Sequence, residues 1–219
     1  MTAEKDRLAV LVVVSLLAYF FWSWPVFYPI RVFTVLLHEL GHAVAGLVTG
    51  GDVAYIKVFS NISGRCAASG LRPVVLAAGY IGAMAFGCLI LLGAARTAYD
   101  RSLSAALGVV ILAVTFLYIR NVFGFLAGLA WGGGLLYAGR KLDAEVNDFL
   151  LSFIGLTVCF TAFGSARAHL IQGRACVTDA KILAHEYWIP AWLSGWVWMG
   201  IVAALFLGTL WLVLRPAKR

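Results

Sequence analysis

The sequence predicts an all-α membrane protein with six or seven transmembrane helices and a short β-hairpin-like insertion. Of its 219 residues, 63% are hydrophobic and only 12% are charged, whereas about a quarter of the residues in soluble domains are charged. Apolar stretches of roughly 20 residues, the length that crosses a bilayer, recur between short links carrying Arg, Lys, Asp, Gly or Pro. We therefore expect one polytopic domain over residues 1–219.

The first apolar segment, residues 8–28, is predicted to be a retained transmembrane helix rather than a signal peptide. It has no small-residue cleavage site, and it runs into Trp22, Trp24 and Tyr28. Aromatic residues of this kind gather at the membrane–water interface, which fits the end of a span.

The second apolar segment covers about residues 30–49 and ends at Gly50-Gly51. A more polar stretch, residues 52–70, follows it. There, alternation typical of a strand precedes a turn signal at 61–64, and the alternating residues are Val53, Tyr55, Lys57 and Phe59. The sequence therefore predicts a short β-hairpin directly after the second segment.

The remaining apolar segments cover 71–95, 104–119, 121–139, 148–166 and 193–214. The segment at 71–95 is rich in Gly and Ala, which let membrane helices approach closely, so we expect it in the interior. Arg120-Asn121 divides the next two segments, and the run Gly132-Gly133-Gly134 weakens the second of them. Two short spans or one bent region would both fit.

The charge distribution points to lipid headgroups and away from nucleic acid. Lys and Arg number 17 against 10 Asp and Glu, a formal net charge of +7. Many basic residues lie at the ends of apolar segments. Examples are Arg96, Arg101, Arg140, Lys141, Arg215, Lys218 and Arg219. Because cytoplasmic ends of membrane proteins are enriched in Lys and Arg, residues 215–219 favour a cytoplasmic C-terminus in a cell membrane.

One cluster of ionisable residues interrupts the apolar run at 32–48: His38-Glu39-Leu40-Gly41-His42. A charged residue at the bilayer centre costs about 2.5–3.5 kcal/mol, so the cluster requires a reason. Residues four apart share one face of a helix, so His38 and His42 can bind one metal ion. The pattern H-E-x-x-H is typical of a Zn2+ site in which the Glu, here Glu39, is the general base. The alternative is that the cluster only stabilises helix contacts.

The third zinc ligand is not fixed by spacing. The candidates are Asp148, Asp179, His169, His185 and Glu186, and a carboxylate is favoured. Asp179 would begin a short helix, where it or Thr178 could instead be the N-cap. Asp148 could instead be a polar residue at the interface end of a span.

These residues resemble the site-2 protease clan of intramembrane zinc metallopeptidases, and within it a subfamily of compact membrane proteins. The zinc motif is followed by Ala77-Ala78-Gly79-Tyr80-Ile81-Gly82, which is similar to that subfamily's Ala-Gly-Tyr-x-Gly signature, and by Thr178-Asp179-Ala180. The resemblance covers about residues 30–195 and implies that Asp179 is the partner of the two His. The Asn-Pro and Leu-Asp-Gly patterns of the better-known members are absent.

The sequence thus predicts a membrane-embedded zinc metalloendopeptidase that cleaves a membrane protein or peptide near or within the bilayer. Its ligands would be His38, His42 and Asp179, and water would reach the metal through a polar cavity lined by residues such as Arg120, Asn121 and Thr178. The hairpin would either bind an extended substrate as an added strand or only connect two helices. The alternative function is a non-catalytic membrane scaffold or regulatory protein; intact Glu39 argues against it. A transporter lacks support because no inverted repeat is visible.

Overall fold

The computed structural model describes residues 13, 20–21, 24–171 and 178–215. Its long helices are α2 (Tyr28–Val48), α3 (Arg72–Arg96), α4 (Asp100–Tyr118), α5 (Val122–Lys141), α6 (Ala144–Ile171) and α8 (Ala191–Leu214). Shorter elements are the 3-10 helix η1 (Pro25–Phe27), the strands β1 (Val53–Val58) and β2 (Gly64–Ala68), and the helix α7 (Asp179–Tyr187). Within the described part of the chain, six helices are long and apolar enough to cross a membrane. The predicted fold class is confirmed, whereas most of the predicted span at 8–28 lies outside the described residues.

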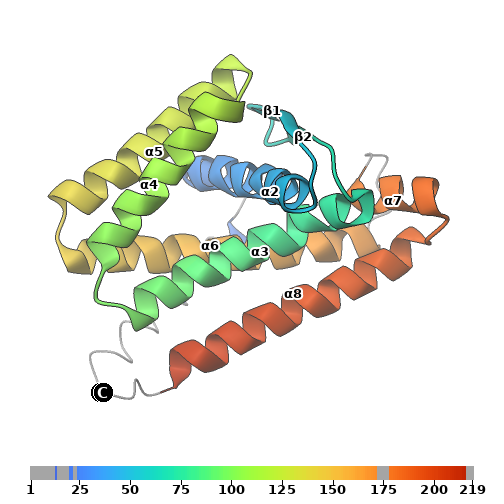
Figure 1. Cartoon of the computed structure of the whole chain (residues 1–219). Coiled ribbons are helices and arrows are strands. Elements are labelled where there is room, and N and C mark those ends of the chain that lie inside the picture. The colour runs from blue at the N-terminus through green and yellow to red at the C-terminus, as the bar shows by residue number, and fades with distance from the viewer. Residues whose placement is uncertain (1–12, 14–19, 22–23, 172–177, 216–219) are drawn as a thin grey trace.

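Helix α3 lies at the centre of the bundle, as its small residues predict (Figure 1). It packs against α2, α6 and α8. A side chain at Gly41 of α2 would collide with the carbonyl oxygen of Ala78 on α3, and one at Gly82 would lie 2.9 Å from the Cα atom of Gly41. The helix that carries the histidines therefore packs backbone to backbone against α3.

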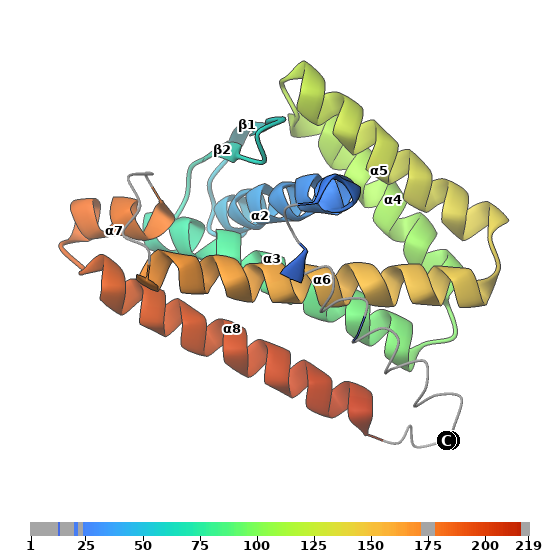
Figure 2. The same ribbon diagram turned by 180° about the vertical axis from the view of Figure 1, so that it is seen from behind.

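Helices α4 and α5 are two separate antiparallel spans rather than one bent region (Figure 2). The Arg120 side chain caps the end of α4: its guanidinium donates hydrogen bonds to the carbonyls of Phe116 and Ile119 at 3.2 and 3.1 Å. The glycine run does not break α5, which continues beyond it. A side chain at Gly132 would collide with Leu112 of α4, so this glycine lets the two helices approach closely.

The hairpin of β1 and β2 is antiparallel, as predicted, and the outer edge of β1 is already occupied. The backbone of Ile119 forms a parallel bridge with Ile56. The Asn121 side chain accepts a hydrogen bond from the Val58 N–H at 3.2 Å and donates one to the Val58 carbonyl at 2.7 Å. The link between α4 and α5 thus holds the hairpin above α2.

Candidate metal centre

The two histidines of α2 face each other one helical turn apart. Their Nε2 atoms lie 3.2 Å apart. The Nδ1 atom of His42 lies 2.6 Å from the Val75 carbonyl oxygen. Because a carbonyl only accepts, Nδ1 carries the hydrogen, and the Nε2 atom of neutral His42 keeps its lone pair. This contact with α3 orients the imidazole as metal-binding histidines are commonly oriented.

Helix α7 brings Asp179 to these imidazoles. Thr178 is the N-cap, and its hydroxyl accepts a hydrogen bond from the Lys181 N–H at 3.3 Å. The capping role therefore falls to Thr178. The Asp179 carboxylate lies 3.4 Å from Nε2 of His38 and 3.6 Å from Nε2 of His42.

The donor atoms of His38, His42 and Asp179 fit a zinc ion. Their ligand atoms all lie within 4.8 Å of one another. A tetrahedral zinc with bonds of 2.0–2.1 Å places its ligand atoms about 3.3 Å apart, close to the three separations found here. Two imidazoles and one carboxylate also leave a fourth position for water, as in catalytic zinc sites.

Glu39 and the imidazoles each lie against a glycine of another element. Glu39 is buried, and a side chain at Gly64 of β2 would lie 2.6 Å from its Cγ atom. A side chain at Gly79 of α3 would lie 2.6 Å from the Nε2 atom of His42. The hairpin thus lies against Glu39, and α3 lies against the histidines.

Aromatic rings support His38. The Tyr80 ring meets the His38 ring edge to face at a centroid distance of 4.7 Å, and Tyr80 stacks on Trp198 of α8 at 5.8 Å. The sequence did not identify either aromatic residue as part of the site. Tyr80 adjoins Gly79 in the Gly/Ala-rich segment, but no local pattern connects Trp198 with α2.

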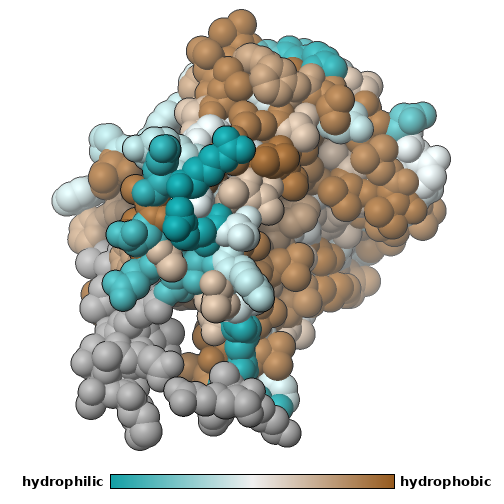
Figure 3. Space-filling model, turned by 60° about the vertical axis from the view of Figure 1, so that its left-hand side comes forward, coloured by the Kyte–Doolittle hydropathy of each residue, from teal (hydrophilic) through white to brown (hydrophobic). Residues whose placement is uncertain are grey.

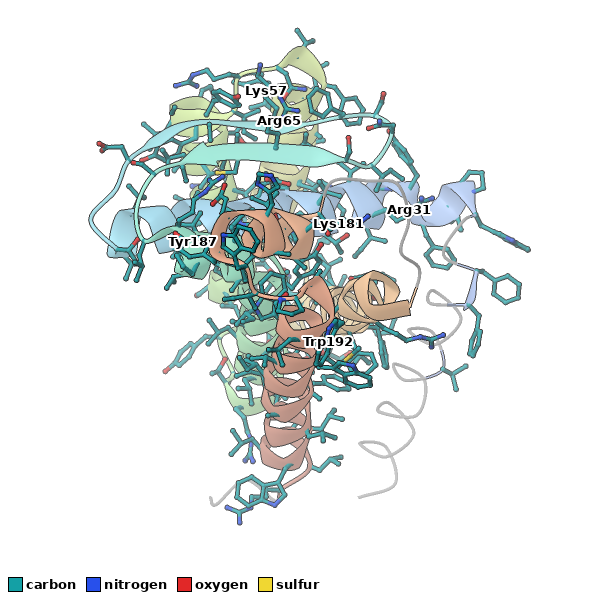
Figure 4. The ribbon with its side chains drawn as sticks, turned by 90° about the vertical axis from the view of Figure 1, so that its right-hand side faces the viewer. Arg31, Lys57, Arg65, Lys181, Tyr187 and Trp192 are labelled. Atoms are coloured by element: carbon teal, nitrogen blue, oxygen red, sulfur yellow. The ribbon has the colours of Figure 1, made fainter. Side chains whose placement is uncertain are left out.

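The site opens into a cavity of about 640 Å³, a size typical of ligand-binding clefts. Residues of α2, the hairpin, α3, α6 and α7 line it, including His38, Glu39, Arg65, Arg72, Thr161 and Asp179. Thr178 lines it as predicted, whereas Arg120 and Asn121 do not. Figure 4 shows the side of the molecule where this cavity lies, with Lys181 on α7 and with Lys57 and Arg65 on the hairpin above it.

The other candidate ligands lie apart from this group. Asp148 on α6 is buried and accepts a hydrogen bond from the Ser152 hydroxyl at 3.4 Å. His185 is exposed, and Glu186 pairs with Arg72, whose hydrogen bonds lower the pKa of the Glu186 carboxyl. The side chain of His169 lies outside the described residues. Among the side chains that the structure describes, no second group of three such ligands meets.

Comparison with known proteins identifies one family. A family model described as Peptidase M50B-like matches residues 9–213. Searches of curated proteins and of solved structures found no match. The matched range includes α2, the hairpin and α7, and therefore every residue of the site.

Proposed function

Because the chain belongs to the Peptidase M50B-like family, we propose that it is a zinc metalloendopeptidase that hydrolyses peptide bonds near or within the bilayer. Its long apolar helices make it an integral, multi-pass membrane protein. The observation that carries the proposal is the convergence of His38, His42 and Asp179 beside Glu39. Three ligands and a base are what a zinc peptidase needs for hydrolysis.

Each residue has a role that follows from its atoms. His38 and His42 would hold the metal through Nε2, and Asp179 would hold it through a carboxylate oxygen. Bound zinc would polarise the scissile carbonyl and lower the pKa of water to about 7. Glu39 would accept a proton from the attacking water and then donate it to the leaving amine.

The cavity and the hairpin supply a place for the substrate. An extended peptide can pair with the edge of a sheet. The edge of β1 is occupied by Ile119–Asn121, so we infer that a peptide would pair with β2, whose residues 64–66 line the cavity. There its backbone would run past Glu39, which lies against Gly64.

Substitution of Glu39 by Gln tests the enzymatic role. The full chain in detergent would be incubated with a pool of synthetic single-span peptides, and mass spectrometry would record the products. We expect Glu39→Gln to keep its metal and to lose at least about 100-fold in cleavage rate, the usual contribution of a general base. Asp148→Asn should cleave normally. The proposal fails if folded, metal-loaded Glu39→Gln cleaves as fast as the unmodified chain. If both proteins bind metal and neither cleaves any peptide, the alternative function of a non-catalytic scaffold is favoured.

A further inference from the structure

Helix α7, which supplies Asp179, packs on helices other than α2, which supplies the two histidines. Helix α7 packs chiefly on α3 and α8. The apolar part of this contact is a cluster of Leu76, Tyr80, Ala180, Leu183 and Trp198. Ala180 and Leu183 set which face of α7 packs inward, but the cluster contains no residue of the last turn of α7. The position of Asp179 relative to His38 and His42 therefore depends on what else holds α7 to α3.

A two-point ion pair makes that connection. The Arg72 Nε atom donates to Oε2 of Glu186 at 3.1 Å, and Nη2 donates to Oε1 at 3.0 Å. Arg72 is the first residue of α3, and Glu186 lies in the last turn of α7. The planar guanidinium gives such a pair a defined geometry as well as attraction.

We propose that Arg72 and Glu186 are positioning residues that fix α7 so that Asp179 reaches the two imidazoles. Asp179 begins α7 and Glu186 lies two turns later, about 10 Å along the axis at 1.5 Å per residue. The ion pair holds the far end of the helix, and the apolar cluster holds its middle. The proposal rests on the metal site proposed above.

If Arg72 and Glu186 acted only through their charges, their substitution would change zinc affinity in a different pattern than if they position α7. Arg72 lines the cavity, so its positive charge opposes the binding of a divalent cation, whereas the charge of Glu186 favours it. If only charge mattered, neutralising Arg72 would tighten zinc binding and neutralising Glu186 would weaken it. If the pair positions α7, both substitutions weaken binding. Both side chains are partly exposed, at 46% and 34%, so we expect the pair to act by fixing the orientation of α7 more than by adding stability.

Zinc affinity of the full chain in detergent, measured by competition with a chelator, separates these cases. We expect Arg72→Gln and Glu186→Gln each to weaken zinc binding about tenfold, the lower end for residues that orient ligands. The double substitution should be no weaker than either single one, and the swap Arg72→Glu with Glu186→Arg should restore affinity. Arg140→Gln, which removes an exposed arginine outside the cavity lining, is the control and should not change binding. Tighter binding by Arg72→Gln, or unchanged binding by both single variants, would overturn the proposal.

Hydrogen exchange in metal-free protein tests the pair independently of zinc. Amides of residues 179–187 should exchange about tenfold faster in each single variant and should return to normal in the swap. Unchanged exchange in the single variants would also overturn the proposal. If the unmodified chain bound no zinc, the proposed function would fail, yet this exchange measurement would still decide whether the pair holds α7.

Discussion

Two glycines lie where a side chain would displace a group of the site. Gly79 of α3 lies against both imidazoles, and Gly64 of β2 lies against the Glu39 carboxylate. Because the two glycines contact different groups of the site, substitutions there should disturb the proposed metal binding and proton transfer separately.

Gly79→Ala should weaken metal binding. The added methyl group would collide with the His38 and His42 rings and displace them, and disturbed ligand orientation typically costs 10–100-fold in affinity. Chelator competition measures the change. Gly134→Ala in α5 is the control, since a side chain there meets nothing within 4 Å, and it should bind metal normally. Normal binding by folded Gly79→Ala would show that α3 does not support the histidines.

Gly64→Ala should instead lower the cleavage rate and leave the metal in place. Its methyl group would displace the Glu39 carboxylate, which we propose to be the base and not a ligand, so the carboxylate would lose its position against the water. Metal content and cleavage rate, measured on the same preparation, check this. Loss of metal in Gly64→Ala would mean that the hairpin also orients the ligands.

At the scale of elements, the hairpin is held by the link between α4 and α5. Asn121 satisfies both backbone groups of Val58, which is buried. The Asn121 side-chain amide supplies one donor and one acceptor, as the backbone of a neighbouring strand would. The position of β2 over Glu39 therefore depends on a residue outside the cavity.

Asn121→Ala should loosen the hairpin. The Val58 N–H and carbonyl would be left without partners, at a cost of about 1–3 kcal/mol for each group that remains buried. Hydrogen exchange at residues 56–58 should become faster, and cleavage should slow. Val122→Ala, at a neighbouring exposed position, should change neither. Unaltered exchange in Asn121→Ala would show that the hairpin holds its place without this contact.

The sequence predicted those elements whose signal is local. The apolar run at about 30–49 indicated α2, and the alternation before the turn at 61–64 indicated the hairpin. Helix α6 begins earlier than hydropathy indicated, at Ala144. In its first turns the buried Asn147 amide donates hydrogen bonds to the carbonyls of Ala138 and Asp143, so a polar residue is accommodated there.

The parts of the site that the sequence left open depend on contacts between distant residues. Spacing did not separate Asp179 from Asp148, since only the packing of α7 on α3 brings the Asp179 carboxylate to the imidazoles. The Val75 carbonyl, the support from Gly79 and the Arg72–Glu186 pair likewise join residues far apart in the chain, and none of them has a pattern of its own.

At the scale of the molecule, the site lies near one end of the bundle. Helices α3, α6 and α8 run side by side, with the hairpin and α7 at one end and the link between α5 and α6 at the other (Figures 1 and 2). Figure 3 shows hydrophilic side chains gathered in one area of a largely hydrophobic face. Exposed charged residues at the far end include Arg140, Lys141 and Asp143. We propose that this far end faces the cytoplasm, as the basic residues after α8 indicate.

Labelling of single cysteines in intact cells tests this orientation. In a chain whose four native cysteines are replaced, a membrane-impermeant maleimide should label Asn61→Cys in the hairpin turn from outside. Asp143→Cys should react only after the cells are opened, because basic ends are retained in the cytoplasm. The opposite labelling pattern would show that the protein has the reverse orientation. Labelling of both cysteines from outside would contradict the arrangement of the helices.

The metal content of detergent-purified protein tests the central claim most directly. It would be measured for the unmodified chain and for His38→Ala, Asp179→Ala and Asp148→Ala, each checked for folding. We predict one zinc per chain, lost with His38→Ala and Asp179→Ala and kept with Asp148→Ala. Absence of metal from the unmodified chain, or its retention in folded Asp179→Ala, would contradict a site built from His38, His42 and Asp179.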